Sequence, residues 1–370
     1  MFEEIARCAE TPTLIINKGT IRQKYQGFFD KFAGAKIYYA LKANPHPEIV
    51  KLLQDCGCGF EISSQGELEL LLGLKIPSGK IISGNPVKEL SSIKLAHTRG
   101  VELFVFDSYA ELEKLSQAAS GSKVCVRLAV SNEGSEWPLS KKFGVEIEEA
   151  VELLVNAKEL GLMPYGIAFH VGSQCTYAEA WAKAIEKSRV VWELAEDRGV
   201  RLHLLNVGGG FPIKYIKPVP SIAEIARVTM DSVRKNFPKD IELVVTPGRA
   251  LVGEAGTLVT TVIAKAARDG EKWLYLNVGV FNGLMETIGG IKYPLAISRQ
   301  NLNAGQGNDR ISKWTLAGPS CDSFDVISTK VELPEMDIGD RIYIMSAGAY
   351  TTAYASQFDG FPIPRTYFVD

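Results

Sequence analysis

The sequence has few of the residues that build metal centres and disulfide scaffolds. Its 370 residues include 4 histidines and 6 cysteines. The nearest cysteines are Cys56 and Cys58, a spacing unlike that of zinc knuckles or redox CxxC pairs. The histidines lie far apart and give no cluster of metal ligands. We therefore expect a metal-free protein with reduced cysteines.

The chain also lacks an excess of charge of one sign and any long apolar run. Its net charge of −2 creates no basic field that would attract nucleic acid or an anionic membrane. No apolar run approaches the roughly 20 residues that a membrane span needs. The segment Met1–Ile5 is acidic and lacks the basic and apolar regions of a signal peptide. These absences predict a cytoplasmic protein that binds neither nucleic acid nor membrane.

What the sequence does contain is a regular alternation of strand and helix patterns. Such alternation is typical of parallel βαβ units. Eight units predict an α/β fold with a closed (β/α)8 TIM barrel, and a doubly wound open sheet is the runner-up. The strand-like runs cover residues 36–41, 59–62, 80–83, 103–106, 123–130, 165–170, 203–207 and 242–246.

The last third of the sequence has a different texture. Short strand patterns are separated there by Gly, Pro and Asp turns, which predicts a mostly antiparallel β domain, a barrel or a sandwich. We predict a TIM barrel over residues 18–255, and a β domain over 256–370 that the N-terminal strand, within residues 1–17, joins. The predicted strands of this β domain are 258–264, 273–277, 313–316, 330–333 and 341–345.

A polar residue or a glycine turn lies at or near the carboxyl end of every one of the eight predicted barrel strands. The carboxyl ends of the strands meet at one face of a TIM barrel, and active sites lie there. Loop residues are commonly polar, so a single position means little, but the complete set predicts an active-site face. The residues are Lys42, Glu61, Asn85, Asp107, Arg127, His170, Gly208–Gly210 and Gly248–Arg249.

Two of these positions favour a particular cofactor. Lys42 is either a lysine that snorkels to the sheet rim or a desolvated amine that forms a Schiff base. The three glycines 208–210 form either a tight turn or, with Arg249 on the neighbouring strand, a phosphate cradle. A Schiff-base lysine and a phosphate cradle in one barrel predict pyridoxal 5′-phosphate. His170 is then placed to stack on the pyridine ring, or it is a hydrogen-bonded core histidine.

With these residues in view, the sequence resembles the fold type III (alanine racemase-fold) pyridoxal-phosphate decarboxylases, in particular the ornithine/lysine decarboxylase branch. The resemblance extends over almost the whole chain. It is carried by the motifs Tyr39-Ala-Leu-Lys-Ala-Asn, Phe60-Glu-Ile-Ser-Ser, Lys142-Phe-Gly, His170-Val-Gly-Ser-Gln, Gly208-Gly-Gly-Phe-Pro, Pro247-Gly-Arg, Gly318-Pro-Ser-Cys-Asp and Gly348-Ala-Tyr.

The resemblance implies a carboxy-lyase for a basic L-amino acid, as in polyamine biosynthesis, that works as a homodimer with shared active sites. Lys42 would form the aldimine, and His170 would stack on the ring. Cys321 would assist protonation of the substrate carbon, and Asp322 would meet the substrate's distal amine, both from across the dimer interface. The cofactor would be bound by Lys42, Glu61, Arg127, His170, Ser173, Gly208, Gly209, Gly210, Thr246, Gly248, Arg249 and Tyr350.

Three positions depart from the family pattern. Thr246 replaces a glutamate that keeps the pyridine nitrogen protonated, and a hydroxyl cannot hold a pyridinium by charge, so the electron sink is weaker unless another group compensates. Asn206 replaces the aspartate before the glycines. The segment after Phe281 has Glu286 as its carboxylate. We predict that Glu286, with Asp322 and Phe281, binds a substrate that can be longer than ornithine; alternatively Glu286 is a solvated loop carboxylate.

Other functions stay open on the sequence alone. The substrate can be a larger carboxylated amine or a siderophore or antibiotic intermediate, and a racemase can use the same scaffold. A non-catalytic homologue that binds a partner protein is also compatible, and Thr246 keeps this alternative open. The retention of Lys42, His170, Arg249 and Cys321 favours the decarboxylase.

Overall fold

The computed structural model describes residues 2–138, 141–298 and 311–370. The chain separates into two compact units. The barrel unit comprises Arg22–Pro212 and Val219–Leu251, and the β unit comprises Met1–Ile21, Ile213–Pro218 and Val252–Asp370.

The strands of the barrel unit close into a barrel in the order β10-β11-β2-β3-β4-β5-β6-β8. Neighbouring strands are parallel throughout. The predicted TIM barrel is therefore confirmed, and the open sheet is excluded. The strands are β2 (Lys36–Ala40), β3 (Gly59–Ile62), β4 (Ile81–Ser83), β5 (Leu103–Phe106), β6 (Lys123–Arg127), β8 (Met163–Ala168), β10 (Leu204–Asn206) and β11 (Glu242–Val245).

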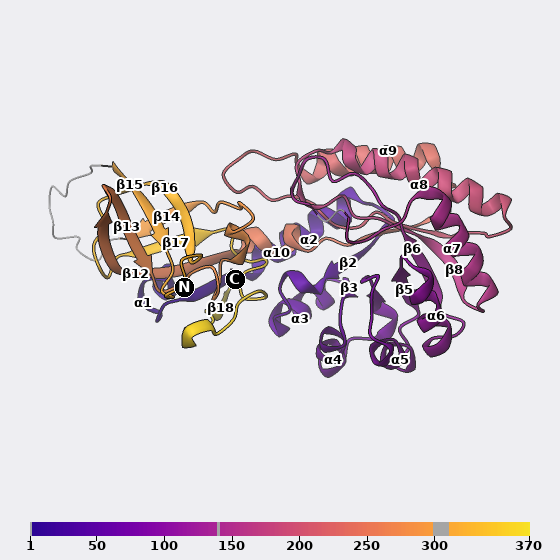
Figure 1. Cartoon of the computed structure of the whole chain (residues 1–370), viewed down its shortest axis with the longest axis horizontal. Helices are drawn as coiled ribbons and strands as arrows, with labels where there is room; N and C mark the ends of the chain where they lie inside the picture. Colours follow the sequence, from indigo (N-terminus) through magenta and orange to yellow (C-terminus); the bar gives the residue numbers. More distant parts are fainter. Residues whose placement is uncertain (1, 139–140, 299–310) are drawn as a thin grey trace. The chain divides into compact units, whose positions relative to one another are not determined.

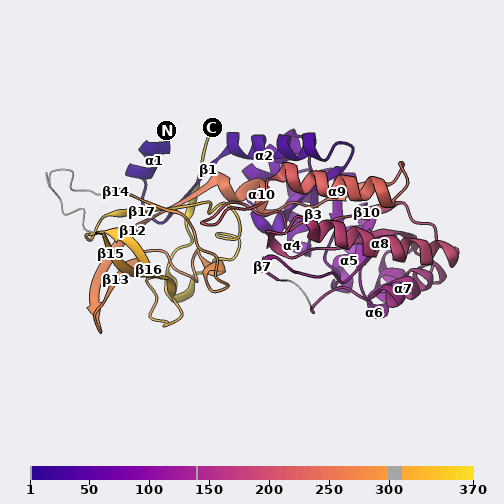
Figure 2. The same cartoon turned by 90° about the horizontal axis from the view of Figure 1, so that it is seen from above.

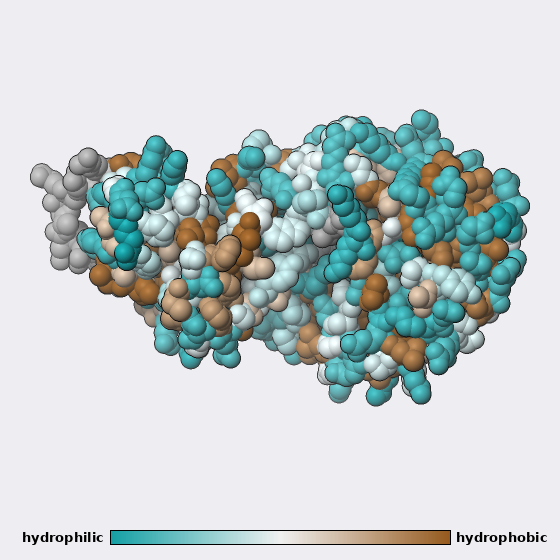
Figure 3. Space-filling view, viewed as in Figure 1, coloured by the Kyte–Doolittle hydropathy of each residue, from teal (hydrophilic) through white to brown (hydrophobic). Residues whose placement is uncertain are grey.

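Helices surround the barrel strands, and α7, α8 and α9 lie side by side in both views (Figures 1 and 2). Hydrophilic side chains, interspersed with apolar ones, cover the visible outer surface of this part of the molecule (Figure 3). The helices are α3 (Pro47–Asp55), α4 (Gln65–Gly73), α5 (Leu90–Thr98), α6 (Tyr109–Ala118), α7 (Ile147–Glu159), α8 (Glu179–Asp197) and α9 (Ile222–Asn236), with α2 (Lys18–Lys31) and α10 (Arg249–Val252) at the unit boundaries.

The barrel is filled by side chains from its own strands. Tyr38 of β2, Ile82 of β4, Cys125 of β6 and Leu204 of β10 belong to one buried cluster. A Cβ at Gly59 of β3 would lie 2.5 Å from the Tyr38 ring, so only glycine leaves room for that ring. This packed interior supports the strand ends that carry the predicted site residues.

The β unit contains a mostly antiparallel sheet of eight strands in the described residues, as predicted. The sequence analysis missed α1 (Phe2–Cys8), β14 and β18. β18 is half-exposed and pairs in parallel only with β1, so its short run lacks the apolar signal of an interior strand. The strands are β1 (Thr13–Asn17), β12 (Gly256–Arg268), β13 (Glu271–Leu276), β14 (Leu295–Ser298), β15 (Ile311–Ala317), β16 (Val326–Pro334), β17 (Arg341–Met345) and β18 (Arg365–Val369).

A buried lysine anchors the loop that follows β4. The Nζ of Lys88 donates to the carbonyl oxygens of Asn85 and Val105, at 2.8 and 2.7 Å, and lies 3.1 Å from a carboxylate oxygen of Glu111. Burial lowers the pKa of Lys88 to about 8, although the Glu111 carboxylate raises it. Because both side chains are nearly inaccessible, each depends on the other for compensation of its charge.

We expect Lys88→Met to destabilise the barrel unit by about 3 kcal/mol, because it leaves the Glu111 carboxylate without its most buried partner. Lys114 still pairs with Glu111 at 2.6 Å, so the loss of stability stays at the lower end of the range for broken buried ion pairs. The midpoint of thermal unfolding should fall by roughly 6–10 °C. Lys114→Met is the matched control: its side chain is 33% exposed, so we expect a loss below about 1 kcal/mol. Equal losses in both variants would contradict the prediction.

Candidate active site

Lys42 lies at the carboxyl end of β2, where the chain turns into the short 3-10 segment Leu41–Ala43. Leu41 and Ala43 are buried, whereas Lys42 is exposed at the strand-end face. The amine expected to be desolvated is therefore accessible in this structure. An accessible amine between two anchored neighbours is in position to react with a carbonyl group.

Glu61 is the penultimate residue of β3, which pairs with β2, the strand that leads to Lys42. The Thr246 hydroxyl donates a hydrogen bond to its carboxylate. Burial raises the pKa of Glu61, whereas the Lys42 ammonium, the Arg127 guanidinium and the Thr246 hydrogen bond lower it. A Cβ at Gly84, after β4, would lie 2.3 Å from a carboxylate oxygen of Glu61, so glycine leaves the room that this carboxylate fills.

His170 follows β8 and is held as a neutral imidazole. The N–H of Gly172 donates to its Nδ1 at 3.0 Å, which places the ring proton on Nε2. Burial lowers the pKa of His170 well below its ordinary value, and the charges of Arg127 and Lys42 lower it further. Arg127, at the end of β6, lies 5.5 Å from the centre of the Phe143 ring. These residues border a cavity of about 430 Å³.

The glycines after β10 form a tightly packed cradle. A Cβ at Gly209 would lie 2.6 Å from the Thr246 carbonyl oxygen, and one at Gly210 would lie 2.3 Å from the Gly172 carbonyl oxygen. Glycine is therefore required here for close approach of the backbone. Asn206 accepts the Gly208 N–H at 2.9 Å, so its amide oxygen makes the turn contact that a carboxylate oxygen would make.

A buried arginine completes this cradle. Arg249 is 3% exposed, and its Nη2 donates to the Ser173 hydroxyl at 3.0 Å. Gly248, which precedes it, is also buried. A guanidinium, a hydroxyl and glycine backbone are the donor set of a phosphate site, so the residues present fit the phosphate of pyridoxal 5′-phosphate. Lys42, on the same barrel face, fits its aldehyde.

The other predicted residues belong to the β unit. Cys321 is exposed, and its Sγ lies 3.4 Å from Oδ2 of Asp359, which also accepts the Cys321 N–H at 3.3 Å. The hydrogen bond and the charge of Asp359 raise the pKa of the Cys321 thiol. A protonated thiol is the form that can donate a proton. The sequence analysis missed Asp359, which lies in a loop turn with a positive φ of 54°.

We expect Asp359→Asn to make Cys321 more reactive, because removal of the carboxylate lowers the pKa of the thiol and increases the thiolate fraction. The rate of iodoacetamide labelling at pH 7.5, followed at Cys321 by peptide mass spectrometry, should rise roughly three- to tenfold. Cys8 in the same samples is an internal control, since it is also exposed. An unchanged rate at Cys321 would show that Asp359 does not set its reactivity.

The loop that carries Cys321 and Asp322 is fixed by a buried aspartate that sequence reasoning missed. Asp325 is 3% exposed and accepts the N–H of Val280 at 2.7 Å and that of Ser320 at 3.0 Å. Asp322 itself is half-buried, and its Oδ1 accepts the Phe324 N–H at 2.8 Å. Asp325 therefore ties this loop to the segment after β13.

The structure does not present Glu286 as a solvated loop carboxylate. Its side chain is 2% exposed, so the solvated alternative is excluded and a substrate would have to open the turn Met285–Thr287 to reach it. The binding of substrate by Glu286 stays a prediction. Phe281 is half-buried and packs its ring on Phe358, with centroids 4.8 Å apart. Tyr350 is half-buried with a φ of 55°.

Glu67 is a second carboxylate near Lys42 that the sequence analysis missed. It lies in the first turn of α4 and accepts the Ser63 N–H, while the Ser64 hydroxyl caps the helix. Burial raises the pKa of Glu67, and the Lys42 ammonium lowers it. The pattern Ser64-x-x-Glu67 is a helix-capping signal, which hides the proximity to Lys42 from the sequence.

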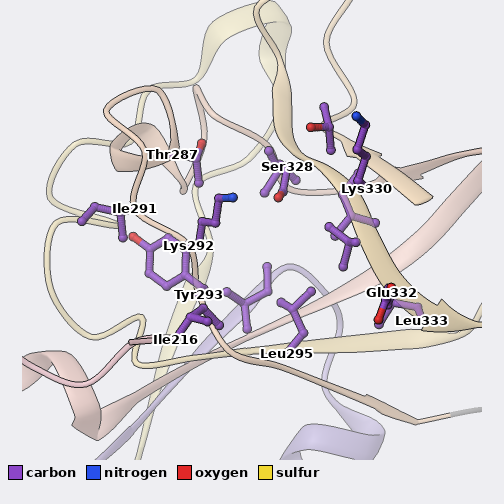
Figure 4. Close-up of a pocket in the computed structure, with 15 residues that line it drawn as sticks. Ile216, Thr287, Ile291, Lys292, Tyr293, Leu295, Ser328, Lys330, Glu332 and Leu333 are labelled. Atoms are coloured by element: carbon purple, nitrogen blue, oxygen red, sulfur yellow. The ribbon is translucent and has the colours of Figure 1, made fainter. Parts of the chain in front are cut away.

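A further cavity of about 320 Å³ lies within the β unit (Figure 4). Its wall is mostly apolar, with Lys292 and Lys330 among its polar members. No predicted site residue lines it, so we assign the chemistry to the barrel face and not to this cavity. Within the described residues, no group of His, Cys, Asp and Glu could hold a metal ion. The described helices include none that is long and apolar enough to cross a membrane.

Comparisons with known proteins agree with this geometry. The family described as "Pyridoxal-dependent decarboxylase, pyridoxal binding domain" matches residues 18–253. A lysine/ornithine decarboxylase of Selenomonas ruminantium is 36% identical over 98% of this chain and 90% of that protein. An antizyme inhibitor 2 of Xenopus laevis is 33% identical over 94% of this chain and 78% of that protein. Among solved structures, the chain is similar to a lysine/ornithine decarboxylase of Vibrio vulnificus in complex with cadaverine, with a TM-score of 0.90 and 30% identity. The similarity covers 100% of this chain and 95% of the other.

Proposed function

The chain belongs to the pyridoxal-dependent decarboxylases of fold type III, in their ornithine/lysine branch, and from that premise we propose that it releases CO₂ from L-lysine or L-ornithine. The observation that carries the proposal is the joint presence of Lys42 and of the cradle formed by Gly208–Gly210, Ser173 and Arg249 on one barrel face. We also propose that the barrel domain covers residues 18–255 and that the β domain covers residues 1–17 and 256–370.

We propose that the barrel residues bind and orient the cofactor. Arg249, Ser173 and the glycine cradle would hold the phosphate, and the amine of Lys42 would hold the aldehyde end of the cofactor. Neutral His170 would pack against the ring. When bound, pyridoxal 5′-phosphate supplies the electron sink for the pair left by departing CO₂.

The residues of the β unit would handle the substrate and the proton. Cys321, held protonated by Asp359, would donate a proton to the carbon that has lost its carboxylate. Asp322 would bind the cationic distal amine, with Phe281 beside the substrate's methylene chain. Exclusion of water from the substrate carboxylate would favour its loss as neutral CO₂.

We propose a cytoplasmic homodimer in which the Cys321 loop completes the partner's site. Phe324, in that loop, is 73% exposed, the largest exposure among the large apolar side chains of the described residues. An aromatic ring this exposed beside Cys321 and Asp322 fits the centre of a subunit interface better than a solvent-facing loop.

Phe324→Glu is therefore expected to weaken the dimer, because it buries a carboxylate in an apolar contact. The dissociation constant, measured by sedimentation, should rise at least about 30-fold, the change typical of an interface hot spot. CO₂ release should fall with the dimer, while cofactor binding by the barrel residues persists. Val190→Glu on α8, 41% exposed, is the control and should leave the dimer intact. A Phe324→Glu protein that stays dimeric would exclude this loop from the interface.

The proposed function is tested by CO₂ release from cofactor-loaded protein. The panel contains L- and D-ornithine, L- and D-lysine, L-arginine, diaminopimelate and carboxynorspermidine, and the absorption band of the bound cofactor is recorded in parallel. We expect release from L-lysine or L-ornithine. Release from a larger amine would correct the substrate. An intact band without release would favour the racemase, and the absence of a band would favour a non-catalytic homologue.

A further inference from the structure

Thr246 leaves the pyridine ring, which is the electron sink of the reaction, without the carboxylate that keeps its nitrogen protonated in the family pattern. A protonated pyridine nitrogen accepts electrons better than a neutral one, and a carboxylate keeps it protonated through its charge. A threonine hydroxyl carries no charge. For the ring nitrogen to stay protonated as in the family pattern, a carboxylate from another part of the sequence has to lie near this position.

The structure provides such a carboxylate at Glu61. Thr246 is 3% exposed, directly after β11, and its hydroxyl donates to the carboxylate of Glu61 at the end of β3. β11 and β3 are the two neighbours of β2, so the Glu61 side chain spans the end of the strand that leads to Lys42. The hydrogen bond holds a carboxylate within one donor–acceptor distance of residue 246.

Two glycines shape this arrangement. Gly84 leaves the space that the Glu61 carboxylate fills, since a Cβ there would lie 2.3 Å from its Oε1. Gly209, in the cradle, lies against the carbonyl of Thr246, since a Cβ there would be 2.6 Å from that oxygen. Thr246 thus links the Glu61 carboxylate to the backbone that forms the phosphate cradle.

We propose that Glu61 supplies the carboxylate that keeps the pyridine nitrogen of pyridoxal 5′-phosphate protonated, and that Thr246 is the positioning residue that orients it. This inference rests on the proposed function. Glu61 belongs to the motif Phe60-Glu-Ile-Ser-Ser, which carries the resemblance, and the Thr246 hydroxyl is the hydrogen-bond donor to its carboxylate. Glu61 then takes over the role of the carboxylate that residue 246 lacks.

The competing role for Glu61 is compensation of neighbouring cations. The charges of Lys42 and Arg127 both lower the pKa of Glu61. The carboxylate could therefore be present only to balance these two cations. That role does not require the Thr246 hydrogen bond, because neither cation needs the carboxylate turned toward residue 246.

The experiment measures the proton on the ring nitrogen directly. The wild-type apoprotein and the variants Glu61→Gln, Thr246→Val and Glu61→Gln/Thr246→Glu are reconstituted with cofactor labelled with ¹⁵N in the ring, and the nitrogen chemical shift is recorded at pH 7.5. Circular dichroism and cofactor titration confirm that each variant folds and binds.

We expect a protonated nitrogen in the wild type, an unprotonated one in Glu61→Gln and a reduced protonated fraction in Thr246→Val. The double variant, which returns a carboxylate to residue 246, should recover the proton. In Glu61→Gln, kcat/KM should fall about 100-fold, the loss typical of one electrostatic catalytic group, while cofactor affinity should change less than threefold because the phosphate cradle is intact.

Two results would overturn the inference while leaving the proposed function standing: an unprotonated nitrogen in an active wild type, or a nitrogen that stays protonated in Glu61→Gln. The second would assign Glu61 to Lys42 and Arg127 alone. Failure of the wild type to bind the cofactor would refute the proposed function and this inference with it. Because binding and protonation are read separately, the two failures are distinguishable.

Discussion

Lys42→Ala is expected to abolish CO₂ release and to change the absorption spectrum of the bound cofactor. The variant lacks the amine that would hold the cofactor covalently, and loss of a covalent catalytic group costs on the order of 10⁴-fold or more in kcat/KM. The alanine leaves Leu41 and Ala43 buried on either side, so the fold should persist. Activity is measured as CO₂ release from L-lysine and L-ornithine, and the absorption spectrum of the cofactor is recorded in the same samples.

Lys36→Ala is the matched control for this prediction. Lys36 lies on the same strand, β2, but at its amino end, where its Nζ lies 2.7 Å from a Glu242 carboxylate oxygen. Its side chain is 58% exposed, so we expect activity within about twofold of wild type. Retention of both activity and spectrum by Lys42→Ala would refute the assignment of Lys42.

The barrel and the position of Lys42 could be predicted because parallel barrel strands are buried on both faces. Such strands appear in the sequence as continuous apolar runs, and the residue that ends each run lies at a known edge of the sheet. The same logic predicts that Glu61, His170 and Arg249 lie on one face of the barrel. Strands that lack this pattern were missed, as β18 shows with its half-exposed residues.

The contacts that give these residues their chemistry were not predictable. The hydrogen bond between Thr246 and Glu61 joins the ends of two strands that are not adjacent in the barrel, and no spacing in the sequence encodes it. The Asp359–Cys321 contact depends on a loop with a positive φ at a non-glycine residue, which sequence patterns disfavour. Glu67 was concealed by its capping pattern. In each case the chemistry depends on tertiary packing that local patterns do not specify.

Arg249→Met is expected to weaken cofactor binding about 30- to 150-fold, because a buried guanidinium contributes charge-assisted hydrogen bonds worth roughly 2–3 kcal/mol. Arg249 is 3% exposed, so water cannot replace it easily. The dissociation constant is measured by titrating the apoprotein with pyridoxal 5′-phosphate, and inorganic phosphate should compete less well against the variant. At saturating cofactor, kcat should recover to within about tenfold, since Lys42 and the proton donor are unchanged.

Two further variants separate the charge of Arg249 from its shape and from its partner. Arg249→Lys keeps the charge but loses the planar fork, so its affinity should be intermediate. Ser173→Ala removes the hydroxyl that accepts from Nη2 at 3.0 Å. It should weaken cofactor binding only about three- to tenfold, because the Arg249 guanidinium itself stays in place. If Arg249→Met binds the cofactor as tightly as wild type, the cradle is not the phosphate site. The glycines would then be the tight turn that was the alternative from the sequence, and their packing against Thr246 and Gly172 would be structural only.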